Sequence, residues 1–153
     1  MSRRPVDTIG PAVQGRAYVR SELEQRGWTV HEVTDGGVTF LEGVAETGAR
    51  VRVRVKSKRS GTWQPTVTSG RETPMPPAVP TFWMFVDLGA SPHTVFIAPD
   101  EWVRRDIYEA HAAYLRTNGG HRARNDASSH HAISAARLEG WRGRWDLLRP
   151  EPA

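Results

Sequence analysis

The chain contains no cysteine. A disulfide framework, a metal site built on thiolates and a cysteine nucleophile are therefore excluded. Lysine is nearly absent too: 19 of the 21 basic residues are arginines, and the only lysines are Lys56 and Lys58. Arginine keeps its charge, whereas lysine can lose it and acts as a compact point charge. The placement of both lysines in one short stretch therefore singles out that stretch.

Long apolar runs are also missing. The longest, residues 82–86, ends at Asp87 and is far too short to cross a bilayer. The arginines at positions 3 and 4 precede no apolar stretch, so the beginning of the chain lacks the pattern of a secretory signal. We therefore expect a cytoplasmic protein that does not contact a membrane.

Two kinds of ligand-binding motif are absent as well. There is no glycine-rich phosphate loop, and the spacing of His111, His121, His130 and His131 matches no compact zinc motif. What remains is typical of a globular chain: 153 residues, of which 38% are hydrophobic. We expect one domain over residues 11–148, preceded by a tail at 1–10 and followed by a frayed end at 149–153.

The most informative stretch is residues 50–59, which we call the basic stretch. Valines at 51, 53 and 55 alternate with Arg52, Arg54 and Lys56, and Lys58 continues the cationic side. This period of two predicts a strand with one apolar and one cationic face. Such a row of like charges persists most easily opposite an anion, either carboxylates of the protein or a phosphate backbone. The net charge of +4 favours nucleic acid, and a solvated edge face is the alternative.

The other elements follow from periodicity and from turn residues. A helix is expected to begin at Pro11, and a second helix to begin near Asp100, which we expect to cap it. A third helix is expected at about 130–139. Strands are expected at 28–33, 38–44, 50–56, 81–88 and 94–98, with a long loop at 59–81. This order predicts an α/β sandwich, a mixed five-stranded sheet flanked by helices.

Several local segments, taken in order, resemble a known superfamily. They are Gln14-Gly15-Arg16 with residues 23–27, then 53–64, 85–88, 95–102 and 145–148. Together they resemble a bacterial branch of the restriction-endonuclease-like superfamily, named for its PD-(D/E)xK motif. The resemblance implies the restriction-endonuclease-like sandwich and metal-dependent hydrolysis of a phosphodiester. Two acids would bind Mg²⁺, and the motif lysine, matched here by Lys56, would orient or activate the attacking water.

The chain departs from this pattern at the metal ligands. Arg54 stands two residues before Lys56, where the motif has an acid. A guanidinium brings positive charge and no lone pair to a place that needs a ligand. Glu42, Asp35 or Glu22 would have to substitute as acids. The resemblance therefore implies the superfamily with a degenerate motif.

Three functional hypotheses follow. In the first, a DNA-associated protein with a degenerate metal site contacts the phosphate backbone through Lys56 and neighbouring basic residues. In the second, an active Mg²⁺-dependent endonuclease uses Lys56 with Glu42, Glu22 or Asp35. In the third, the chain is a non-catalytic interaction subunit that binds a second copy or another protein. Trp63 either stacks on a base or folds its loop into the core. The nucleic-acid-contacting residues of the first hypothesis are Arg52, Arg54, Lys58, Arg59, Trp63 and Arg122.

Overall fold

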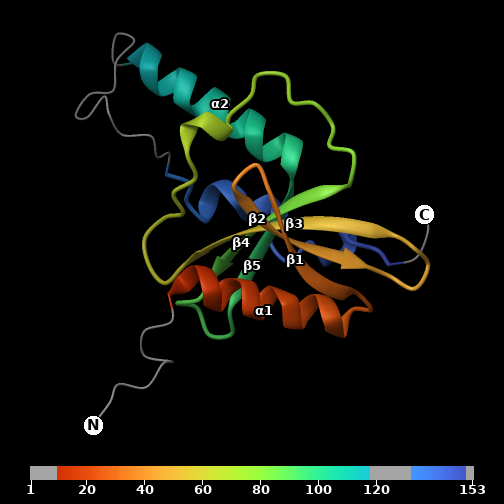
Figure 1. Cartoon of the computed structure of the whole chain (residues 1–153). Helices are drawn as coiled ribbons and strands as arrows, with labels where there is room; N and C mark the ends of the chain where they lie inside the picture. Colours follow the sequence, from red (N-terminus) through yellow and green to blue (C-terminus); the bar gives the residue numbers. More distant parts are fainter. Residues whose placement is uncertain (1–9, 118–131, 151–153) are drawn as a thin grey trace.

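The computed structural model describes residues 10–117 and 132–150 (Figure 1). Its centre is a five-stranded sheet in which the strands follow the order β1-β2-β3-β4-β5. All neighbouring strands are antiparallel except β3 and β4, which are parallel, so the predicted α/β class and mixed sheet are confirmed. The strands are β1 (Thr29–Asp35), β2 (Val38–Val44), β3 (Arg50–Lys58), β4 (Thr81–Asp87) and β5 (Thr94–Pro99).

Helix α1 (Pro11–Gln25) covers one face of the sheet. Val19 and Leu23 are fully buried there against the valines of β3. Gly15 makes the closest approach, since a Cβ atom built on it would lie 1.6 Å from Ser57 Oγ. Glycine is therefore needed for α1 to lie this close to β3. The short helix η4 (Trp145–Leu147) packs on the same face.

The opposite face carries helix α2 (Asp100–Thr117) and the short helices η2 (Val67–Ser69) and η3 (Ala136–Trp141) (Figure 1). A second core cluster, which includes Trp63, Trp83, Phe85 and Phe96, fills this side. The segment between β3 and β4 runs against α2, where Arg71 N–H donates to Arg104 O at 2.9 Å. This connection brings β4 alongside β3 in parallel. None of the helices in the two described ranges is long and apolar enough to cross a membrane.

Two local predictions on this face are corrected. The helix expected at about 130–139 is absent from its described part. Ile133 instead exchanges backbone hydrogen bonds with Trp63, and a 3₁₀ helix begins only at Ala136. Burial of Ile133 beside Trp63 favours the extended conformation over the local helical preference. Asp100 was expected to cap α2 from the position before its first residue. It is instead the first residue of α2, and its carboxylate accepts hydrogen bonds from the Trp83 and Arg104 side chains.

The sheet opens between β2 and β3. Their ladder ends at the pair Leu41–Val53, although β3 stays paired with β4 as far as Lys58. The backbone of Arg52 and of Lys58 faces β4, with bonds to Pro80 and Leu88. Because backbone groups alternate along a strand, those of Val55 and Ser57 face the opposite side. No described strand pairs with β3 there, and we call residues 54–58 the open edge.

Candidate functional site

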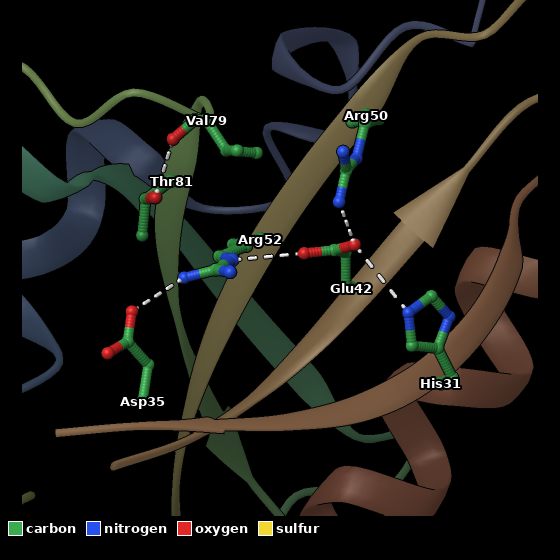
Figure 2. A network of polar contacts seen from close by, with 7 residues as sticks. All are labelled: His31, Asp35, Glu42, Arg50, Arg52, Val79 and Thr81. Carbon is green, nitrogen blue, oxygen red and sulfur yellow. Dashed lines mark hydrogen bonds and ion pairs between the residues drawn. The ribbon is translucent and has the colours of Figure 1, made fainter. Parts of the chain in front are cut away.

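The beginning of the basic stretch is neutralised by acids of the protein (Figure 2). Glu42, only 3% exposed, accepts hydrogen bonds from Arg50 and from Arg52, the latter at 3.0 Å. Arg52 also reaches Asp35 at 3.1 Å, and His31 Nε2 lies 3.6 Å from Glu42. The hydrogen bond from Arg50 is the main cause that lowers the pKa of Glu42, against the effect of burial. Arg52, predicted to contact nucleic acid, is thus held in an internal network.

The cations at the end of the basic stretch also have partners within the protein. Lys58 Nζ lies 3.3 Å from Asp87, its partner in the β3–β4 register, and 4.7 Å from the centre of the Trp63 ring. Arg59 donates to the side-chain oxygen of Gln14 on α1. Both cations therefore already have partners within the protein.

Arg54 and Lys56, in the middle of the stretch, are different. Both are half-buried, and neither forms a hydrogen bond or ion pair with any residue in the described part of the chain. The Arg54 guanidinium lies 4.2 Å over the Trp83 ring. Burial, followed by the charge of Arg54, lowers the pKa of Lys56, and burial with the charge of Arg104 lowers the pKa of Arg54. The charge of Asp100 partly opposes this effect on the pKa of Arg54, but Asp100 is itself bound to Arg104. Two neighbouring charges are thus partly removed from water without an ion-pair partner in the described part of the chain.

These two cations face a cleft that follows the open edge. Its volume is about 490 Å³, and its walls come from β3, the β1–β2 turn, the beginning of α1 and the loop after β3. No carboxylate is among its lining residues in the described structure. Arg16 from α1 adds a third cation, although Glu32 lies 3.7 Å from it. We call this feature the cationic cleft. Its charged and polar walls include Arg16, Thr39, Arg54, Lys56, Ser57 and Gln64.

The acids suggested as metal ligands do not meet beside Lys56. Glu22, on α1, is bound to Arg26 at 2.9 Å. Glu42 and Asp35 are bound to arginines of β3 (Figure 2). Residues 10–117 and 132–150 hold no group of three side chains able to bind a metal ion. Mg²⁺ is held in proteins mainly through carboxylates, and the cleft beside Lys56 has cations and no carboxylate among its lining residues in the described structure, so these residues do not fit it.

The remaining predicted residues have mixed outcomes. Trp63 is 1% exposed and donates its indole N–H to Val86 O, so it folds its loop into the core. Arg122 lies outside the described residues. Sequence reasoning missed Arg16 as a cleft residue and missed the open edge. The signal for Arg16 was its neighbour Gly15, because a glycine on a buried helix face marks a close approach to the sheet.

The candidate site therefore consists of Arg54 and Lys56, assisted by Arg16, at the open edge of a mixed sheet. Its chemistry is that of an anion receptor, since it offers donors and positive charge and, among the described residues, no acid. Comparison with known proteins adds no relative: no family model, curated protein or solved structure matches the chain.

Proposed function

We propose that this chain is a DNA-binding protein that holds phosphate in the cationic cleft. The observation that carries the proposal is the pair Arg54 and Lys56, half-buried and without an acid partner in the described structure. Holding two like charges this close is unfavourable unless an anion joins them. A phosphate supplies that anion, and its oxygens accept hydrogen bonds from both guanidinium and ammonium groups.

Other groups in the cleft favour the same ligand. Ala12, in the first turn of α1, lines it, and the free N–H groups at the beginning of a helix favour an anion. The open edge adds the backbone N–H groups of Val55 and Ser57. These segments border a cleft that has no negative side chain among its lining residues in the described structure.

The resemblance to restriction-endonuclease-like proteins supports DNA as the source of the phosphate. In this proposal Lys56 contacts a phosphate oxygen, and Arg54 occupies the place of a metal ligand. No hydrolytic step follows from such a site, because a guanidinium cannot coordinate a cation. The protein would bind DNA without cutting it at this cleft.

The test measures the affinity for a fluorescently labelled duplex by anisotropy as salt is varied. If Arg54 and Lys56 together engage about two phosphate charges, log K should fall with log [salt] at a slope of about −1.8. The double variant Arg54→Met/Lys56→Met should lose most of the affinity and most of the slope. Arg105→Met is the matched control, since Arg105 is an exposed cation on α2 outside the cleft.

Two outcomes would contradict the proposal. Affinity that does not respond to salt, or that survives the double variant, would remove the cleft as the DNA-binding site. Cleavage of the duplex that requires Mg²⁺ or Mn²⁺ and disappears in Lys56→Met would replace it with the nuclease hypothesis.

A further inference from the structure

The cationic cleft is a local site, not one point in a track along the surface. A duplex carries one negative charge per about 1.7 Å of its axis, so proteins that follow its backbone need a series of available cations. On β3 the cations on both sides of the cleft already have partners: Arg52 with Glu42 and Asp35, and Lys58 with Asp87. Arg59 is bound to Gln14. The basic stretch therefore offers one pair of cations without a hydrogen-bond or ion-pair partner in the described structure, and the cations on either side of this pair are held by other groups of the protein.

The charge of the pair selects among phosphates. A backbone phosphodiester carries a single negative charge, whereas a phosphomonoester carries about −1.5 to −2 at pH 7. Arg54 and Lys56 supply two positive charges with no acid among the lining residues of the described structure. Arg16 adds little net charge, because Glu32 lies 3.7 Å from it. A phosphomonoester neutralises the pair, and a phosphodiester leaves about one positive charge uncompensated.

The shape of the cleft agrees with this choice. About 490 Å³ lies between four separate segments of the chain, a space in the range of small-ligand sites. Backbone N–H groups on the open edge add donors for the additional oxygen that a terminal phosphate exposes. Neither Trp63 nor Trp83 offers a face for stacking on a base, because both are at most 1% exposed.

We infer that the cationic cleft binds the terminal phosphate of a nucleic-acid strand, a phosphomonoester dianion held by Arg54 and Lys56 at the open edge of β3. This inference rests on the proposed function, because it specifies which phosphate of the nucleic acid enters the cleft. Recognition of this kind depends on the chemistry of the strand end and is indifferent to base sequence. It also requires no bending of the duplex around the protein.

The experiment compares three blunt duplexes of one sequence that carry a phosphate on the 5′ ends, on the 3′ ends or on neither. Anisotropy titrations use the full chain, the variants Lys56→Met and Lys56→Gln, and the control Arg105→Met. Thermal unfolding establishes that each variant is folded. We expect one phosphorylated duplex to bind at least tenfold more tightly than the unphosphorylated one. This difference should disappear in both Lys56 variants and persist in the Arg105→Met control.

The outcomes separate the inference from the proposed function. If all three duplexes bind with equal affinity and the Lys56 variants lose this affinity, the end-phosphate inference is overturned and the proposed binding of backbone phosphate remains. No binding of any duplex would overturn both. The matching 5′- or 3′-mononucleotide and inorganic phosphate serve as competitors. If either displaces the phosphorylated duplex at a concentration equal to that of the duplex, the strand end is overturned as the source of the bound phosphate. Competition only at concentrations at least tenfold higher would support it.

Discussion

Replacing Lys56 by methionine should make the protein more stable. Lys56 and Arg54 are two residues apart on one strand face, which places them about 6.6 Å apart along β3. If the two charges keep this backbone spacing, they repel by about 0.6 kcal/mol in water and by about 2.5 kcal/mol at an effective dielectric constant of 20. Both side chains are half-buried, so an intermediate value of about 1 kcal/mol is reasonable after salt screening. Methionine keeps the apolar stem of lysine and removes this repulsion.

The pH dependence of this gain has a definite sign. Burial, followed by the charge of Arg54, lowers the pKa of Lys56 from its ordinary value of 10.5. Between the lowered pKa and 10.5 the unfolded chain binds more protons than the folded one, so the stability of the wild type rises with pH. The advantage of Lys56→Met should therefore be complete at neutral pH. It should shrink as the pH rises through the folded-state pKa toward 10.5.

The assay is thermal and urea unfolding of the wild type, Lys56→Met and Lys58→Met under identical conditions. For a chain of this length 1 kcal/mol corresponds to a midpoint shift of about 2–4 °C. Lys58→Met is the matched control, since it removes the same group two residues away but leaves Asp87 without its partner at 3.3 Å. We expect opposite signs: an increase for Lys56→Met and a decrease for Lys58→Met. A decrease for both would refute the view that Lys56 is an uncompensated charge.

Two further substitutions test the contacts around the cleft. Gly15→Ala should destabilise the protein by about 1–3 kcal/mol, because overpacking would force α1 away from β3; a Cβ atom there would lie 2.8 Å from Ser57 Cβ. Adding Ser57→Gly should recover part of that loss in urea unfolding, and no recovery would contradict this contact. Glu42→Gln should cost about 2 kcal/mol, since it weakens two charge-assisted hydrogen bonds to a buried carboxylate. The hydrogen bond from Arg50 lowers the pKa of Glu42 from 4.5, so the loss of stability in Glu42→Gln should be complete above pH 4.5 and shrink as the pH falls. A loss of stability that does not change with pH would contradict the stabilising role of the ionised Glu42 carboxylate.

Much of the fold was predictable because its signals are local. The alternation of valines and cations in the basic stretch predicted β3, and the turn residues around it predicted the hairpin with β2. The helix predicted at about 130–139 was wrong for a non-local reason. Ile133 pairs with Trp63, a residue 70 positions earlier in the chain, and no periodicity within the segment reports such a partner.

The candidate site was predictable only in part, for a related reason. Sequence reasoning identified the row of cations and singled out Lys56 and Arg54 by their match to the motif, but it assigned phosphate contacts to Arg52, Lys58 and Arg59 as well. Their acids come from other strands: Glu42 lies on β2, Asp35 at the end of β1, and Asp87 on β4. Only the register of the sheet shows which cations form ion pairs, so the absence of such partners for Arg54 and Lys56 in the described part of the chain could be found only in the structure.

The open edge also bears on how the protein behaves at high concentration. A stretch of strand with unpaired backbone groups is a template on which another chain can add a strand. Arg54 and Lys56 flank this template with positive charge, so the same segment of a second copy is repelled by it. The charges that make the cleft an anion receptor thus also disfavour pairing of this edge with the same edge of a second copy. Polyvalent anions that neutralise Arg54 and Lys56 would remove this repulsion and allow the open edges of two copies to pair.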